Sequence, residues 1–377
     1  MKLLLAILMV ASSAYGQILV PPGQCTDSAL LYCDIFNIDP CPCSIGVPVR
    51  VAHIGPSSQI GVDYRLPKEV GIHALNYKDS DFDSWIDYAD EIHLDGFTTA
   101  QLWVDIPPYC PGHWEEPFPS HVWVQDQPDC EFQQLVQHGP VKYLFLRIGV
   151  TSWMVNEGEG CYIMDTAPLG FIVNRLYDMA WYKDLTIVLV PWEQDWYPRG
   201  CPGTPTNEDY VERLDRLVKF ESERQRQVEQ SRRAKMRQYP DARLQVLHAM
   251  VVNKFPGYNL APDDLLLPTV SDAIGWMVED PDLYEPDLVG ISYWKRGLDP
   301  VPALDYVKER TLYPKRRLFI AEFGARTDEQ PQRYLDYVPV FWDWGIRTIL
   351  IWVHEDNWED RYTITPEGLN SLLELMK

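Results

Sequence analysis

Short apolar runs alternate with amphipathic stretches along most of the chain, and this rhythm predicts the fold. The stretches between the runs have helical spacing; one starts at Thr206 or Asn207, either of which can cap it, and another ends at Gly345. The runs have the length of strands and are rich in Val, Ile, Leu and aromatic residues: VGIHALNY (70–77), FTTAQLWV (97–104), VKYLFLRIGV (141–150), LTIVLVPW (185–192), RLQVLHAMVV (243–252), LVGISYW (288–294), RLFIAEFG (317–324) and RTILIWV (347–353).

Alternation of strands and helices predicts a parallel sheet covered by helices, which is an α/β fold. The number of runs favours a closed (β/α)8 TIM barrel over residues 69–377, and the 377 residues of the chain are enough for one. The alternative is an open doubly wound sheet. That fold is expected to carry a glycine-rich phosphate-binding loop after its first strand, and VGIHALNYKDSD contains no such loop.

The chain before residue 69 has a different character. Residues 1–16 combine one Lys, a short apolar run and small residues, which is the pattern of a secretory signal peptide cleaved after Ala14 or Gly16. The apolar run at residues 3–11 is too short to cross a membrane. Residues 17–68 are rich in Cys, Pro, Gly and Ser, so we expect an irregular N-terminal cap in a secreted, extracellular protein.

Cysteine usage agrees with export, since an even number of cysteines in an exported chain favours disulfides. We expect the cap cysteines, from Cys25 to Cys43, to pair mainly among themselves, and we expect the pairs Cys110–Cys130 and Cys161–Cys201 because each closes a single loop region. The spacing of Cys41 and Cys43 is poor for zinc, so no metal is expected. The chain has eight cysteines: Cys25, Cys33, Cys41, Cys43, Cys110, Cys130, Cys161 and Cys201.

A net charge of −22 argues against nucleic acid and anionic membranes as partners. The chain lacks a GxSxG elbow, an HExxH motif and a Walker loop, which leaves the common serine-hydrolase, zinc-protease and nucleotide chemistries without support. We expect a monomer without a cofactor.

The ends of the predicted strands carry the candidate chemistry, because active sites of such barrels lie at the C-terminal ends of the strands. Glu193 follows the fourth run and Glu322 lies in the seventh, with Asp195 as a reserve acid. Two carboxylates among aromatic rings suit sugar chemistry, in which one acid protonates the leaving oxygen and the other group attacks the anomeric carbon or activates water. Other polar or aromatic residues at these ends are expected to bind substrate: Arg147, Trp192, Trp196, Asn253, Tyr293, Trp294, Trp352 and His354.

LFIAEFG and FWDWGIRTILIWVHEDN resemble the last two strands of the retaining (β/α)8 glycoside hydrolases of clan A, with an organisation similar to glycoside hydrolase family 5. The resemblance implies that Glu322 is the nucleophile, Glu193 the acid/base, Tyr293 a tyrosine that hydrogen-bonds the nucleophile, and Trp352 the floor of the sugar subsite. The sequence departs from the family at Trp192, where an Asn normally precedes the acid/base and contacts the sugar 2-hydroxyl. Asn253 is a candidate for the missing amide.

Three interpretations remain open on the sequence alone. The first is a secreted, retaining glycoside hydrolase that cleaves O-glycosidic bonds of a poly- or oligosaccharide. The second is a carbohydrate-binding barrel without full catalytic activity, which the Trp192 departure favours. The third is a structural extracellular protein, in which the aromatic residues at the strand ends would be buried rather than exposed. For Glu322 itself, the alternative to a catalytic role is that of an ion-pair partner, for instance of Arg147.

Overall fold

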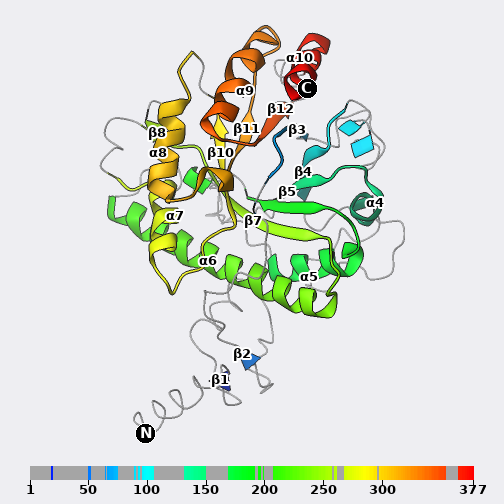
Figure 1. Cartoon of the computed structure of the whole chain (residues 1–377). Coiled ribbons are helices and arrows are strands. Elements are labelled where there is room, and N and C mark those ends of the chain that lie inside the picture. Colours follow the sequence, from blue (N-terminus) through cyan, green and yellow to red (C-terminus); the bar gives the residue numbers. More distant parts are fainter. Residues whose placement is uncertain are drawn as a thin grey trace, which may run out of the picture. The chain divides into compact units, whose positions relative to one another are not determined.

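The structure is a computed structural model of the whole chain, and two compact units, residues 1–59 and 60–377, are distinguished in it. In the first unit, β1 (Ile18–Leu19) pairs antiparallel with β2 (Arg50–Val51) (Figure 1). The expected signal peptide, nearly all of the expected cap and all eight cysteines lie outside the described residues. The structure describes residues 18–19, 50–51, 64, 66–74, 89–90, 92–93, 96–105, 131–149, 169–191, 194–196, 198, 207–256, 259–260, 267–294, 297–353 and 364–377.

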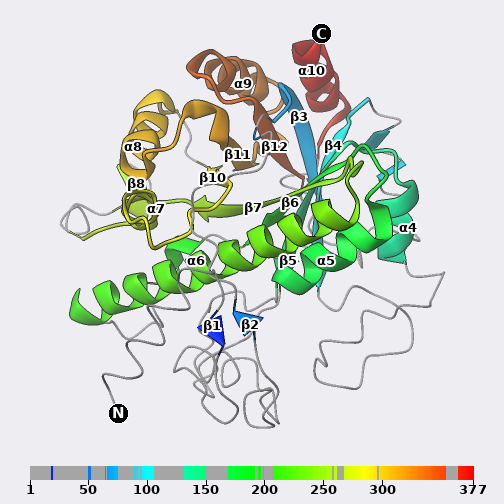
Figure 2. The same ribbon diagram turned by 60° about the horizontal axis from the view of Figure 1, so that its bottom comes forward.

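The second unit contains the predicted (β/α)8 barrel, which is therefore confirmed (Figures 1 and 2). Each apolar run overlaps one strand, and the strands pair in parallel in the closed order β10-β11-β12-β3-β4-β5-β6-β7. The barrel strands are β3 (Glu69–Ala74), β4 (Thr99–Asp105), β5 (Tyr143–Gly149), β6 (Thr186–Val190), β7 (Gln245–Val252), β10 (Leu288–Tyr293), β11 (Leu318–Phe323) and β12 (Thr348–Val353).

Helices follow the strands and cover the barrel. The long helix predicted from Asn207 is α6, which lies beside α5 (Figure 2), and the helix predicted to end at Gly345 is α9, where Gly345 has the positive φ of 119° that favours glycine. No helix among the described residues is long and apolar enough to cross a membrane. The described helices of the barrel unit are α4 (Glu131–His138), α5 (Leu169–Ala180), α6 (Asn207–Gln238), α7 (Val270–Glu279), α8 (Val301–Thr311), α9 (Gln332–Trp344) and α10 (Pro366–Met376), and the short elements are η2 (Gln194–Trp196), η4 (Lys315–Arg317), β8 (Phe255–Pro256) and β9 (Asn259–Leu260).

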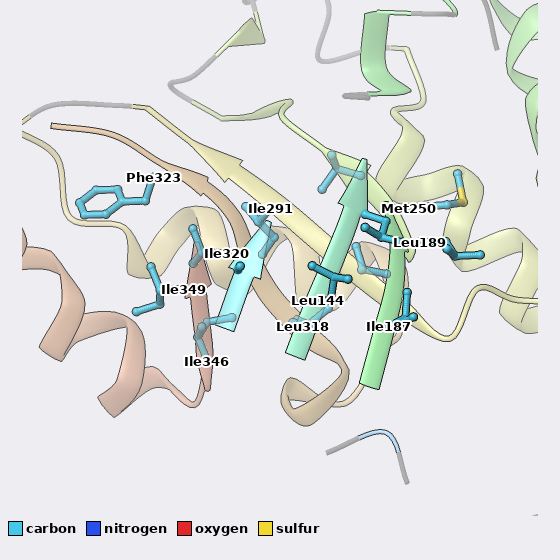
Figure 3. Packing of buried hydrophobic residues seen from close by; sticks show 14 of the residues in the cluster. Leu144, Ile187, Leu189, Met250, Ile291, Leu318, Ile320, Phe323, Ile346 and Ile349 are labelled. Atoms are coloured by element: carbon cyan, nitrogen blue, oxygen red, sulfur yellow. The ribbon is translucent and has the colours of Figure 1, made fainter. Parts of the chain in front are cut away.

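Successive strand residues face opposite sides, which produces two apolar clusters. On β7, Leu247 and Val251 belong to the cluster inside the barrel, whereas Val246 and Met250 belong to the cluster between strands and helices. Figure 3 shows part of this outer cluster, including Met250 and Ile291. The face of each strand residue therefore decides whether it reaches the barrel interior or the helix layer.

Polar groups also join α6 to the outer face of the barrel. Asp287, just before β10, accepts two hydrogen bonds from the guanidinium of Arg232, at 2.9 and 3.2 Å, and a third from the backbone N–H of His248. The imidazole of His248 lies 3.0 Å from Gln225 and 3.3 Å from Glu221, both on α6. These buried contacts fix the position of α6 on the strands.

Candidate active site

Five of the described side chains gather near the C-terminal ends of the strands and are called here the Glu322 cluster. Each lies within the last three residues of its strand or directly after it, and β5 and β11 stand on opposite sides of the closed strand order. Active sites of (β/α)8 barrels occupy this end. The cluster consists of Arg147 on β5, Ser292 on β10, Trp294 directly after β10, Glu322 on β11 and Trp352 on β12.

A β-bulge turns Glu322 toward the barrel interior. Ile320 pairs with Ile349 and Phe323 with Ile351, so three steps along β11 correspond to two along β12. Ile320 and Phe323 both belong to the outer cluster, and the two residues between them, Ala321 and Glu322, lie opposite one residue of β12, Leu350. Ala321 belongs to the inner cluster, and Glu322 contacts Arg147 from across the barrel. A bulge that re-aims a side chain in this way is common next to active sites.

Both oxygens of the Glu322 carboxylate are engaged. Oε1 lies 2.7 Å from Nη1 of Arg147, in an ion pair whose side chains are 2% and 5% exposed. Oε2 accepts hydrogen bonds from Ser292 Oγ, at 2.9 Å, and from Trp294 Nε1, at 3.2 Å. The carboxylate is therefore fixed by charge on one side and by two neutral donors on the other. The ion pair with Arg147, which the sequence offered as the alternative interpretation of Glu322, is present.

Two indole rings border this carboxylate. Trp294 and Trp352 meet edge to face, with ring centroids 5.2 Å apart and an interplanar angle of 78°, and the guanidinium carbon of Arg147 lies 5.9 Å from the Trp352 ring. Indole faces are surfaces on which the apolar faces of sugar rings can stack. The placement of Trp352 near Glu322 agrees with what the resemblance implies for this tryptophan, although Trp352 itself is 9% exposed in this structure.

Tyr293 does not make the hydrogen bond to Glu322 that the resemblance implies. Its hydroxyl donates to the carbonyl oxygen of Leu298, and its ring packs against Phe255 and against Phe341 of α9, in the outer layer. The reason is strand alternation, because Tyr293 lies between two residues, Ser292 and Trp294, that both reach Glu322. Among the described residues, the donors to Glu322 Oε2 are thus the neighbours of Tyr293 and not Tyr293 itself.

Ser292 is the residue of the Glu322 cluster that was not expected from the sequence. In the run LVGISYW, a period of two places Ser292 and Trp294 on one face and Tyr293 on the other. This period can be read from the sequence, but it does not show which of the two faces points into the barrel. A short hydroxyl beside a large aromatic residue is also an inconspicuous signal, since serines in strands are common.

Asp195, the reserve acid, has a structural set of partners. Its Oδ2 accepts hydrogen bonds from the backbone N–H groups of Asn253, at 2.7 Å, and Lys254, at 3.0 Å, and its Oδ1 accepts from Val270 N at the start of α7, at 3.3 Å. Burial raises the pKa of Asp195, while Lys254 and the three N–H groups act in the opposite direction. This carboxylate therefore joins the end of β7 to the start of α7. Asn253 itself is buried at the end of β7.

Other expected site residues are not placed. Trp192, Glu193 and His354 lie outside the described residues, and so does the side chain of Trp196. Within the described part of the chain, no three His, Cys, Asp or Glu side chains converge as metal ligands would.

No protein-family model matches the sequence, and no curated protein matches it. Among solved structures, the chain is similar to a GH26 beta-mannanase from Bacteroides ovatus, with 10% identity over 82% of this chain and 88% of that chain and a TM-score of 0.45. It is also similar to a GH5-4 broad specificity endoglucanase from Clostridium acetobutylicum, with 14% identity over 81% of this chain and 97% of that chain and a TM-score of 0.46. A third similar structure is endoglucanase Cel5A from Thermotoga maritima, with 12% identity over 81% of this chain and 96% of that chain and a TM-score of 0.45. Any functional assignment therefore depends on the residues at the barrel mouth.

Proposed function

We propose that the protein is a glycoside hydrolase that cleaves O-glycosidic bonds of a poly- or oligosaccharide with net retention, using Glu322 as nucleophile and Glu193 as acid/base. The observation that carries the proposal is the Glu322 cluster: a bulge directs one carboxylate inward at the catalytic end of a (β/α)8 barrel, beside two indoles.

The proposed reaction has two steps. In the first, Glu322 attacks the anomeric carbon and forms a glycosyl ester while the glycosidic C–O bond breaks and Glu193 gives its proton to the leaving oxygen. In the second, Glu193 takes a proton from water, the water oxygen attacks the anomeric carbon, and the ester bond breaks to restore Glu322. Trp352 and Trp294 would stack against the sugar, and Arg147 would keep Glu322 in place through its ion pair.

The test is hydrolysis of a panel of aryl β-glycosides and polysaccharides, with β-mannan and cellulose derivatives among them, by wild-type protein and by Glu322→Ala. We expect the variant to lose at least about a thousandfold in kcat on the best substrate and to regain part of it with azide, because a small anion can occupy the space of the missing carboxylate. Glu309→Ala is the matched control, since Glu309 is exposed on α8. Full activity of Glu322→Ala would contradict the proposal.

Glu193 is tested by its dependence on the leaving group. Glu193→Ala should slow substrates with poor leaving groups far more than substrates such as dinitrophenyl glycosides, because only the poor leaving groups need a proton. An equal effect on both classes would remove Glu193 from the acid/base role.

The second candidate is a carbohydrate-binding protein without turnover. The burial of Glu322, which is 4% exposed and ion-paired in this structure, favours it. Calorimetric titration with the same oligosaccharides separates the two functions: a binder would retain affinity and show no product from any sugar in the panel, whereas a hydrolase releases reducing ends.

We further propose that the protein is exported and disulfide-bonded, on the basis of residues 1–16 and the even cysteine count. Intact mass spectrometry of the unreduced secreted protein tests this. The expected chain starts after residue 14 or 16, and its mass is lower than that of the reduced chain by two hydrogens per disulfide. Four free thiols between Cys25 and Cys43 would contradict the expected pairing within the cap.

A further inference from the structure

We propose that Ser292 and Trp294 are positioning residues that hold Oε2 of Glu322 and leave Oε1 as the attacking oxygen. This inference rests on the proposed function of Glu322 as nucleophile and adds to it the way in which the nucleophile is aimed. The role that the resemblance gives to Tyr293 then belongs to the residues on either side of it.

The contacts of Oε2 carry the inference. Ser292 Oγ donates to Oε2 at 2.9 Å, and the indole N–H of Trp294 is shared between Oε2, at 3.2 Å, and Ser292 Oγ, at 3.1 Å. The three groups form a closed triangle of short polar contacts. Ser292 is fully buried, so water does not compete for its hydroxyl.

The lone pairs of the carboxylate distinguish its two oxygens. Each carboxylate oxygen accepts about two hydrogen bonds. Oε2 accepts from Ser292 and from Trp294, which fills its capacity, whereas Oε1 has Arg147 as its described partner, at 2.7 Å. Oε1 thus retains an unshared electron pair, and that pair forms the bond to the anomeric carbon as the glycosidic C–O bond breaks toward the protonated leaving oxygen.

The positions of both donors are fixed by the strands. Ser292 is the register partner of Glu322 on the neighbouring strand, so its short side chain reaches the carboxylate. Trp294 is fixed from the other side by Gly324, because a Cβ on Gly324 would come within 2.2 Å of its ring atom Cζ3. The residues that set the indole therefore lie on or directly after β10 and β11, the strand that carries Glu322. Rotation of the Glu322 carboxylate would break two hydrogen bonds at once.

The first experiment measures this geometry without a substrate. In protein with ¹⁵N-labelled tryptophan, the signal of the Trp294 indole N–H is identified by its loss in Trp294→Phe. We expect Glu322→Ala to move this signal, since the carboxylate oxygen beside the N–H is removed, and Tyr293→Phe to leave it in place. An indole signal that does not respond to Glu322→Ala would overturn the positioning role, whatever the activity of the protein.

The second experiment measures the effect on the reaction. With 2,4-dinitrophenyl β-cellobioside and the corresponding β-mannoside, β-xyloside and β-glucoside as probes, Ser292→Ala and Trp294→Phe should each lower kcat about tenfold to a hundredfold on the hydrolysed probe, because a misplaced nucleophile loses its alignment with the anomeric carbon. KM should change less than threefold. Tyr293→Phe is the matched control and should remain within twofold of wild type in both constants.

A conservative variant separates positioning from folding. Ser292→Thr keeps the hydroxyl and should recover most of the kcat that Ser292→Ala loses, with thermal unfolding measured on every variant. Loss of kcat in Ser292→Thr equal to that in Ser292→Ala, with both variants folded, would contradict the role of the hydroxyl. So would a decrease in Tyr293→Phe as large as that in Ser292→Ala.

The identity of the attacking oxygen has its own readout. A crystal structure of the ester trapped with a 2-deoxy-2-fluoro glycoside should show the sugar on the oxygen that faces Arg147, with Ser292 and Trp294 still bound to the other oxygen. An ester on the oxygen bound by Ser292 would overturn the assignment. If the indole signal responds as expected but no probe is hydrolysed, the hydrogen-bonded triangle stands and the proposed hydrolase function fails, so the two failures are distinguishable.

Discussion

Gly324 is in direct contact with the indole that borders the proposed nucleophile. A methyl group at this position would approach three ring atoms of Trp294, at 2.2, 2.7 and 3.0 Å, which is closer than side chains tolerate. The glycine in the sequence EFG therefore sets the distance between the backbone after Glu322 and the ring. A small residue at such a close approach influences the site because it leaves room for the neighbouring side chain.

We expect Gly324→Ala to displace Trp294, to lower kcat/KM about a hundredfold and to destabilise the fold by about 1–3 kcal/mol, as overpacking does. Enzyme kinetics and urea unfolding measure the two effects. Trp294→Phe removes part of the ring that the methyl group meets, so the double variant should be less impaired than the sum of the single variants. Additive effects in this cycle would show that Gly324 acts independently of Trp294.

Asp195 illustrates a carboxylate whose buried partners are structural. Asp195→Ala should lower the free energy of unfolding by about 3 kcal/mol or more, because it removes the acceptor of three buried backbone N–H groups and the negative charge that interacts with Lys254. Folded Asp195→Ala should retain the wild-type dependence on the leaving group, which Glu193→Ala should not. A selective loss on poor leaving groups in Asp195→Ala would instead identify Asp195 as the acid.

At the scale of elements, the contact between α6 and the barrel contains a titratable group. Glu221 on α6 is buried, with Arg224 at 3.0 Å, Gln194 of η2 at 2.6 Å and His248 of β7 at 3.3 Å. Burial acts to raise the pKa of Glu221, but Arg224 and His248 outweigh it, so the pKa is lowered from the ordinary 4.5. The folded state therefore binds the proton of Glu221 less readily than the unfolded state does.

A carboxyl group whose pKa is lower in the folded than in the unfolded state stabilises the fold at pH values above its unfolded-state pKa. This stabilisation is lost as the pH falls through the folded-state pKa. We expect the free energy of unfolding to decrease as the pH falls below about 4.5, and Glu221→Gln to make this decrease smaller while costing about 3 kcal/mol at pH 7 through the loss of the buried ion pair with Arg224. Urea unfolding at pH 7 and pH 4 measures both effects. An unchanged pH dependence in Glu221→Gln would assign the acid sensitivity to other groups.

The elements also show what the sequence predicts and what it does not. Apolar runs of strand length identify every barrel strand, because a parallel strand buried on both faces has to be apolar throughout. The same continuity hides which face of a run is the interior, so the sequence pattern could not correct the place beside Glu322 that the resemblance implied for Tyr293. The bulge in β11 depends on pairing with β10 and β12, and a pairing register is not contained in a single strand.

For the whole molecule, the ion pair between Arg147 and Glu322 crosses the barrel from β5 to β11. Such a buried pair is a weak source of stability, because desolvation of two charges offsets their attraction. Arg147→Met combined with Glu322→Leu should therefore leave the free energy of unfolding within about 1 kcal/mol of wild type and abolish hydrolysis. Arg147→Met alone should cost about 3–5 kcal/mol, because it leaves a buried carboxylate without its cation. If the double variant were as unstable as Arg147→Met alone, the ion pair between Arg147 and Glu322 would instead be a source of stability.

The barrel also makes a prediction about stereochemistry. In the closed strand order, β6, which Glu193 follows, is separated from β11, which carries Glu322, by β7 and β10. Carboxylates that face each other across a small mouth come close enough for direct attack, for which a separation of about 5–5.5 Å is typical, whereas inversion needs roughly 6.5–9.5 Å to admit a water molecule. Each retaining cycle inverts the anomeric carbon twice, once on ester formation and once on its hydrolysis.

We therefore expect the first sugar released to have the anomeric configuration of the substrate, as measured by proton NMR before mutarotation. Glu322→Ala with azide omits one of the two inversions and should give a glycosyl azide of the opposite configuration. This product is the control for the retained configuration expected from the wild type. A first product of inverted configuration from the wild type would place water between the carboxylates. Glu322 would then be a base toward that water, the ester would not form, and the positioning of Oε2 by Ser292 and Trp294 would serve proton transfer instead of attack on carbon.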